Sequence, residues 1–149
     1  DIAYKHGPMI SPRLYKEFIL PYHKKLINFF RSHEVDIILL DTDGNHNSLT
    51  PLFLESGVNM IEPLEVAAGM DARALRKKYG KRLALMGNID KRVLSIGKEA
   101  IEREVNQKLP LTIEGGYIPK VDHSVPSTVP FKNYVYYITL LKKWMHNNC

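Results

Sequence analysis

The sequence has almost no cysteine and no long apolar run. Its one cysteine is the last residue, Cys149, which excludes an intrachain disulfide and a thiolate-rich metal site. Such sparse cysteine is typical of the reducing cytoplasm. No stretch approaches the roughly 20 apolar residues of a membrane-spanning helix, and the mixed polar start lacks the pattern of a signal peptide. We therefore expect a cytoplasmic protein with no membrane partner.

Nucleotide-binding motifs are also missing. The sequence contains no Gly-x-Gly-x-x-Gly turn and no phosphate-binding loop, so nucleotide binding has no support. The net charge of +5 would permit an anionic partner. The basic residues are scattered over expected helix faces without aromatic residues between them, as at Lys24-Lys25 and Arg76-Lys77-Lys78. We interpret them as solvated surface and expect no nucleic-acid partner.

What the chain does have is the composition of one globular domain. It is 149 residues long, with 44% hydrophobic and 25% charged residues, enough to bury a core of its own. We therefore treat residues 1–149 as a single domain. The chain starts at Asp1 without an initiator methionine, as though in the middle of a strand. This start leads us to expect a fragment of a longer protein.

Residues 36–46 carry the clearest sign of a site. The apolar run 37–40 predicts a strand buried on both faces, as in a parallel sheet covered by helices. The run ends on Asp41 and Asp43, whose side chains point to the same side of an extended chain. Because α/β folds place their sites at the carboxyl ends of parallel strands, we predict that this pair serves a function. Alternatively, one aspartate caps the next helix and the other is solvated.

Strands and helices alternate along the chain. Further strands are predicted at 58–64, 82–90 and 115–123. Helices are predicted from Ser11-Pro12 onward with a kink at Pro21, then over 49–55, 72–79 and 98–109, and from 130 onward. This order predicts an α/β fold with four parallel strands. It fits an open doubly wound sheet or half of a (β/α)8 barrel, and the mid-strand start favours the half-barrel.

Several motifs are familiar as an ordered set. They are Gly7–Pro12, Phe18–Tyr22, Asp43-Gly44, Gly69–Asp71, Lys78–Lys81, Met86–Asp90, and Gly115–Ile118 with Asp122-His123. The set covers essentially the whole chain and resembles the uroporphyrinogen decarboxylase family, which includes the haem-pathway decarboxylase and corrinoid-linked methyltransferases. The resemblance implies the C-terminal half of a (β/α)8 TIM barrel, from the end of its fourth strand to its last helix.

The decarboxylase branch implies a lyase that converts the acetate side chains of a tetrapyrrole to methyl groups without a cofactor. The family's late histidine falls on His123, which we expect to be catalytic together with Asp43. The other strand-end groups are expected to bind the substrate: Asp41, Glu62, Asn88 and Asp122. For Glu62 the alternative is a salt bridge across the loops, and for His123 a hydrogen bond to a neighbouring loop.

This sequence departs from the decarboxylase pattern in two ways. Asp122 and Ser124 flank His123 where the decarboxylase has glycines, and a carboxylate neighbour would raise the proton affinity of the imidazole. The family's main arginine and aspartate contacts also fall in the half of the barrel that precedes these motifs. We therefore expect the chain alone to be inactive.

The methyltransferase branch activates a thiol on zinc with a His-x-Cys pair and a later cysteine. Asp41-Thr42-Asp43 stands at the His-x-Cys position here, and zinc favours nitrogen and sulfur ligands. The alternative is therefore Mg²⁺, Mn²⁺ or a non-haem metal held by Asp41, Asp43 and His123. A corrinoid protein would then be the methyl donor or acceptor.

Assembly follows from the half-barrel. Half a barrel exposes two sheet edges and an apolar interior, so we expect a homodimer whose halves shield each other's edges. A third alternative is a non-catalytic half-barrel that pairs with a different chain.

Overall fold

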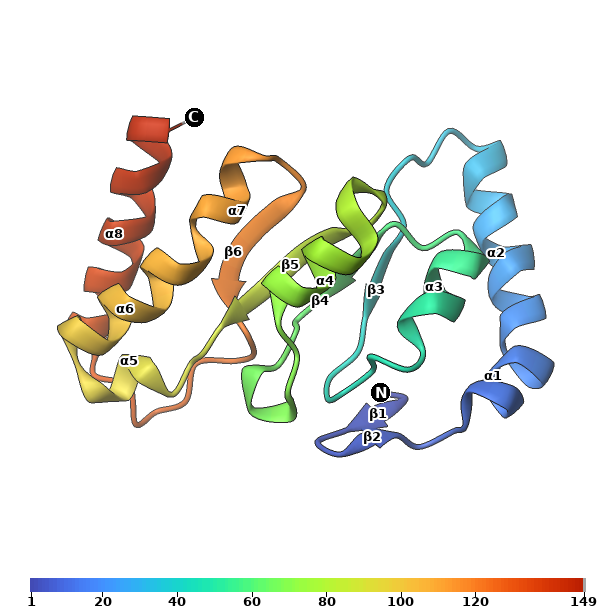
Figure 1. The fold of residues 1–149 in the computed structure, drawn as a ribbon, viewed down its shortest axis with the longest axis horizontal. Helices are drawn as coiled ribbons and strands as arrows, with labels where there is room; N and C mark the ends of the chain where they lie inside the picture. Colours follow the sequence, from blue (N-terminus) through green and yellow to red (C-terminus); the bar gives the residue numbers. More distant parts are fainter. Residues whose placement is uncertain (149) are drawn as a thin grey trace.

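The computed structural model describes residues 1–148 and alternates strands with helices (Figure 1); Cys149 lies outside the described residues. The strands are β1 (Ala3–Tyr4), β2 (Gly7–Pro8), β3 (Leu39–Asp41), β4 (Met60–Glu62), β5 (Ala84–Ile89) and β6 (Tyr117–Val121). The α-helices are α1 (Pro12–Phe18), α2 (Leu20–Ser32), α3 (Thr50–Ser56), α4 (Ala72–Tyr79), α5 (Val93–Ile96), α6 (Lys98–Lys108), α7 (Pro110–Ile113) and α8 (Phe131–Asn148). Short 3-10 turns, η1 (Val66–Ala68) and η2 (Gly80–Arg82), flank α4. No helix in this part of the chain is long and apolar enough to cross a membrane.

Strands β3 to β6 form one parallel sheet in the order β3-β4-β5-β6. A doubly wound sheet reverses its strand order at a switch point, whereas here the spatial order follows the chain. The fold is therefore α/β with four parallel strands alternating with helices, as in a partial TIM barrel, and the predicted fold class is confirmed.

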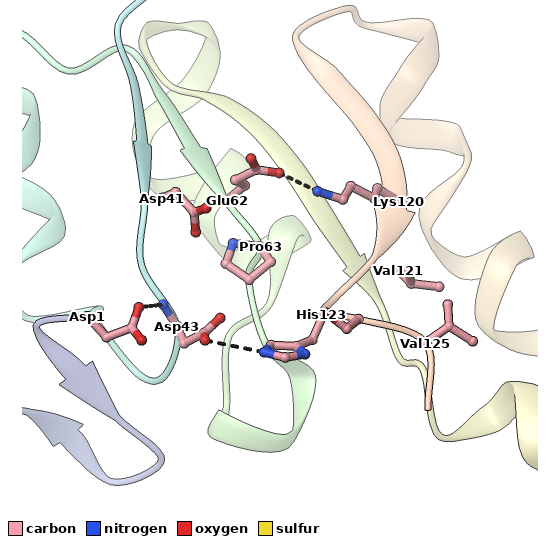
Figure 2. A pocket seen from close by; sticks show the side chains of 10 residues that line it. Asp1, Asp41, Asp43, Glu62, Pro63, Lys120, Val121, His123 and Val125 are labelled. Atoms are coloured by element: carbon pink, nitrogen blue, oxygen red, sulfur yellow. Dashed lines mark hydrogen bonds and ion pairs between the residues drawn. The ribbon is translucent and has the colours of Figure 1, made fainter. Parts of the chain in front are cut away.

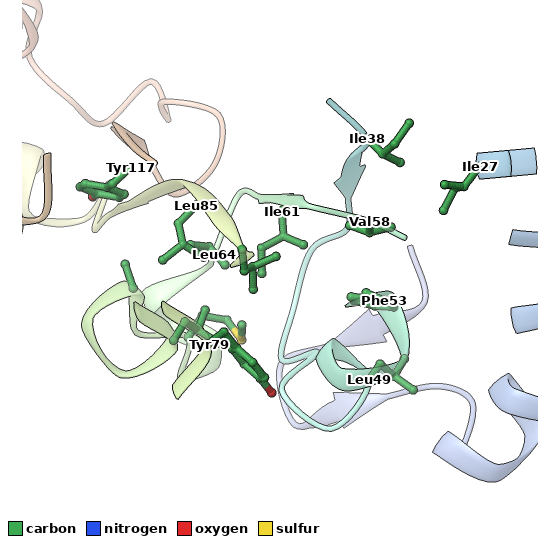
Figure 3. Close-up of a cluster of buried hydrophobic side chains, with 14 of the residues drawn as sticks. Ile27, Ile38, Leu49, Phe53, Val58, Ile61, Leu64, Tyr79, Leu85 and Tyr117 are labelled. Atoms are coloured by element: carbon green, nitrogen blue, oxygen red, sulfur yellow. The ribbon is translucent and has the colours of Figure 1, made fainter. Parts of the chain in front are cut away.

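The core lies between the sheet and its helices. One register row, Leu40, Ile61, Leu85 and Tyr117, crosses all four strands and belongs to the cluster that packs under α2, α3 and α4 (Figure 3). A second cluster joins Ile89 and Val121 to α5, α6 and α8. The strands are thereby fixed from one side, which leaves their carboxyl ends free to carry polar groups.

Local signals set most helix boundaries as expected. The Ser11 hydroxyl accepts a hydrogen bond from the Leu14 amide and Pro12 opens α1. Asp71 caps α4, and Gly57 ends α3 with φ 101°. The expected kink at Pro21 is instead a break at Ile19, which separates α1 from α2. The short helices α5 and α7 were not predicted.

The strand predicted at 36–41 is shorter and more exposed than expected. Only Leu39–Asp41 form β3, and Ile37 and Leu39 are 67% and 42% exposed. The prediction of a strand buried on both faces is therefore wrong. The reason is that the core covers only one face of this edge strand: Ile38 and Leu40 pack into the core, whereas Ile37 and Leu39 point to the opposite face.

The first residues do not continue the main sheet. β1 pairs antiparallel with β2 in a separate two-stranded ribbon, although the resemblance implied a parallel barrel strand here. The ribbon packs against the loop after β3, where the Tyr4 carbonyl accepts a hydrogen bond of 2.8 Å from the Asn45 amide. This contact braces the loop that carries Asp43.

Candidate active site at the carboxyl ends of the strands

An open cavity of about 550 Å³ lies at the carboxyl ends of β3, β4 and β6 (Figure 2). Its lining is mostly polar and comes from four separate segments: Asp1, Asp41, Asp43, Glu62, Pro63, Lys120, Val121, His123, Ser124 and Val125. Four of the six predicted site residues, Asp41, Asp43, Glu62 and His123, therefore meet in one place. Asn88 and Asp122 do not line it.

Asp43 and His123 form the most suggestive pair in the cavity. The His123 Nε2 atom lies 3.3 Å from Asp43 Oδ2, and the two side chains are 37% and 34% exposed. The Asp43 amide donates to Asp1 Oδ1 at 3.1 Å, which fixes the backbone from which the carboxylate extends. A half-buried imidazole oriented by a carboxylate can accept or donate a proton to a ligand in the cavity.

Glu62 and Lys120 form a second pair on the cavity wall. Lys120 Nζ donates to Glu62 Oε2 at 2.7 Å, and the Glu62 side chain is largely buried. Glu62 therefore does form a salt bridge, but with a residue of β6 rather than across the loops as the alternative expected. Asp41 stands beside Glu62 in the β3–β4 register and is exposed, so its carboxylate is open to a ligand.

Glu65 forms a cluster with Asp43 and His123, and the sequence did not reveal this role. Its Oε2 atom accepts a hydrogen bond of 2.8 Å from the Gly44 amide. One ligand atom each from Asp43, Glu65 and His123 lies within 4.8 Å of the others. Glu65 therefore takes the place predicted for Asp41 in a three-residue ligand set. Its one signal in the sequence is its position shortly after the predicted strand 58–64.

Asn88 is a structural residue, contrary to the prediction that it binds substrate. It is fully buried, and its Oδ1 atom accepts from the Ala72 amide at 2.9 Å. Its Nδ2 atom donates to the carbonyls of Leu64 and Met70. The amide is therefore fully used in holding the loop between β4 and α4.

Asp122 is also not available to a substrate, and that prediction is wrong. The residue is 1% exposed. Its Oδ1 accepts from the Lys91 amide and its Oδ2 from the Val66 amide, both at 2.9 Å. Burial raises the pKa of this carboxyl, and the two backbone hydrogen bonds oppose the rise. The carboxylate beside the His123 ring is that of Asp43, not that of its chain neighbour Asp122.

Comparison with known proteins gives the same family as the motifs. Residues 2–144 match the family model described as uroporphyrinogen decarboxylase (URO-D). The chain is 29% identical over 143 residues to "Uroporphyrinogen decarboxylase" of Geobacter metallireducens, covering 89% of this chain and 38% of the relative. It is 30% identical over 128 residues to "Uroporphyrinogen decarboxylase" of Legionella pneumophila strain Paris, covering 85% and 36%. For "Uroporphyrinogen decarboxylase, chloroplastic" of Zea mays the identity is 27% over 137 residues, covering 89% and 33%. The chain thus spans 33–38% of the length of these relatives.

Proposed function

Because the chain belongs to the uroporphyrinogen decarboxylase family, we propose that it supplies one wall of a carboxy-lyase site acting on the acetate side chains of uroporphyrinogen in the cytoplasm. The observation that carries this proposal is the Asp43–His123 pair, 3.3 Å apart at the mouth of the sheet. The names of the relatives support the substrate class.

The chemistry requires a proton donor and a way to stabilise positive charge. Protonation of a pyrrole carbon makes the ring an electron sink, and the bond to the carboxyl carbon breaks with loss of CO2 to leave an exocyclic methylene. A second proton converts the methylene to a methyl group, and the first proton leaves the ring carbon, which restores the aromatic pyrrole. His123 is suited to deliver a proton, with Asp43 orienting its ring. The exposed Asp41 is suited to accept pyrrole N–H groups, because a carboxylate is an acceptor for charge-assisted hydrogen bonds.

Substitutions in the pair should weaken tetrapyrrole binding. We expect Asp43→Asn and His123→Gln each to raise the Kd for uroporphyrinogen about tenfold or more, because a hydrogen bond to a charged group contributes about 1.5–3 kcal/mol. Anaerobic calorimetric titration measures this. Asp36→Asn removes one charge at the other end of β3, where the side chain is 98% exposed, and should leave Kd unchanged. Equal affinity of all four proteins would contradict the proposal.

We expect binding by this chain without turnover. Among the residues that line the cavity, Lys120 is the one lysine or arginine, and Glu62 already occupies its ammonium group. A carboxylate-rich substrate needs further cations to hold its acetate groups. Release of CO2 from uroporphyrinogen by the purified chain would show that these cations are not required.

A metal-assisted, methyltransferase-like function is the second candidate, favoured by the Asp43–Glu65–His123 cluster. Two oxygen ligands and one nitrogen ligand, with no thiolate, do not fit the thiol-activating zinc of that branch. They fit a harder cation such as Mn²⁺ or Mg²⁺. Such an ion would supply a Lewis acid beside the exposed wall of the cavity, while these three side chains would hold and orient it.

Substitutions inside and outside the ligand set can test metal binding separately from the decarboxylase proposal. If the cluster is a site, Mn²⁺ at about a hundredfold above its Kd should stabilise the fold by about 2.7 kcal/mol, measured by urea unfolding. Glu65→Gln should abolish this gain, whereas Asp41→Asn, outside the cluster, should preserve it. A gain that survives Glu65→Gln would rule out this cluster as the ligand set.

We also propose that the chain forms a homodimer. The free edges of β3 and β6 and the exposed apolar side chains of Ile37, Leu39 and Ile118 support it, because such edges pair readily with other strands. Light scattering should give twice the chain mass, and Leu39→Lys should shift it towards the monomer. Ile96→Lys, an exposed residue of α5, which packs against α6 and α8, serves as control. A monomeric wild-type chain at all concentrations would refute the dimer, and would leave pairing with a different chain to be tested.

A further inference from the structure

Three hydrogen bonds between loops surround the Asp43–Glu65–His123 cluster. The Gly44 amide donates to Glu65 Oε2 at 2.8 Å, and the Val66 and Lys91 amides donate to Asp122 at 2.9 Å each. In each of these bonds, at least one partner is the chain neighbour of a cluster residue. Gly44 follows Asp43, Val66 follows Glu65, and Asp122 precedes His123.

Asp122 is the centre of this arrangement. Its side chain extends from the end of β6 and reaches backbone groups in the loops that follow β4 and β5. A carboxylate that is 1% exposed is tolerated only when its oxygens are hydrogen-bonded, and here one N–H group occupies each oxygen. The carboxylate therefore joins the ends of three neighbouring strands, and it does so directly beside His123.

We infer that Asp122 is a positioning residue: its two backbone hydrogen bonds hold Glu65 and His123 at the distances from Asp43 that the proposed site requires. The role in binding that we assign to Asp122 rests on the proposed function, whereas the hydrogen bonds that it makes do not. Glu65 continues the chain of contacts by holding the Gly44 amide, so the loops after β3, β4 and β6 are set as one unit.

The effect can be measured by NMR on the ligand-free chain. Asp122→Asn keeps the size of the side chain but turns one acceptor into a donor that faces an N–H group. We expect the amide resonances of Val66, Lys91 and Gly44 and the ring resonances of His123 all to move in the folded variant. Asp71→Asn is the matched control, because Asp71 also accepts two backbone N–H groups, at the start of α4. It should leave the Gly44 and His123 signals in place.

The same variants test the consequence for binding. Asp122→Asn should raise the Kd for uroporphyrinogen about tenfold while Asp71→Asn leaves it unchanged. If the chain binds no tetrapyrrole, the NMR comparison still decides the positioning role, so the two proposals fail separately. Unmoved Gly44 and His123 signals in folded Asp122→Asn, or equal movement in Asp71→Asn, would overturn the inference. If Asp122→Asn does not fold, hydrogen exchange of the wild-type Val66 and Lys91 amides decides: slow exchange is expected, and exchange at the rate of free loop amides would overturn it.

Discussion

Replacing Gly87 by alanine is expected to destabilise the fold by about 2–5 kcal/mol. Gly87 has φ +105°, and a Cβ atom built on it would lie 1.9 Å from the Pro63 carbonyl oxygen. The left-handed backbone costs about 1–2 kcal/mol for an L-residue, and forced overpacking adds about 1–3 kcal/mol. Relief is difficult because the obstructing atom belongs to the backbone and also accepts a hydrogen bond from the Asn88 amide.

Gly115→Ala separates the two causes of this loss. Gly115 has φ +76°, but nothing lies within 4 Å of the Cβ position, so only the backbone cost of about 1–2 kcal/mol applies. Urea unfolding of both variants measures the difference. Equal losses would mean that the close approach of β5 to Pro63 is unimportant. A larger loss for Gly87→Ala would show that the peptide after Pro63, a residue on the wall of the cavity, is held by direct contact with β5.

The helix boundaries could be predicted because their signals are local. A Ser-Pro pair begins α1, an aspartate and a glycine bracket α4, and Gly57 ends α3 with a left-handed conformation. Each of these depends on a few adjacent residues. The exposure of Ile37 and Leu39 could not be predicted in this way. It depends on whether the second face of β3 is covered, and an apolar run has the same pattern in either case.

Only part of the site could be predicted from the sequence, because some of its contacts depend on the path of a loop. Strand ends gather at one edge of a parallel sheet, so Asp43 and His123 could be expected to meet. Adjacent residues of an extended chain tend to point to opposite sides, and the structure follows this alternation at Asp122 and His123, of which only His123 lines the cavity. Glu65 and Asn88 depend on the path of the loop after β4, which no local pattern specifies.

Acid is expected to destabilise the fold through His46, which lies at the end of the loop that carries Asp43. His46 is fully buried, its ring packs 5.7 Å from that of Phe53, and its Nε2 atom has no hydrogen-bond partner among residues 1–148. Burial lowers its pKa to about 4, and a backbone hydrogen bond only partly offsets this. An imidazolium at this position would therefore be a buried charge without a counter-ion.

The sign of the effect follows from proton binding. An unfolded histidine titrates near 6.5, so between that pH and about 4 the unfolded chain binds a proton that the folded chain does not. The contribution of His46 to the free energy of unfolding is therefore fully present above about pH 6.5. It is lost as the pH falls towards about 4, by about 3 kcal/mol in total. Asp122, whose raised pKa favours the folded state in acid, opposes part of this loss.

Urea unfolding at pH 7, 5.5 and 4.5 measures the slope. His46→Phe should flatten it by removing the titrating group from the core, whereas His33→Gln, an exposed histidine at the end of α2, should leave it unchanged. An equally steep slope in His46→Phe would assign the acid sensitivity to other groups. If His46 is responsible, its protonation acts first on the segment between β3 and α3, and acid should therefore separate Asp43 from His123 before the sheet itself unfolds.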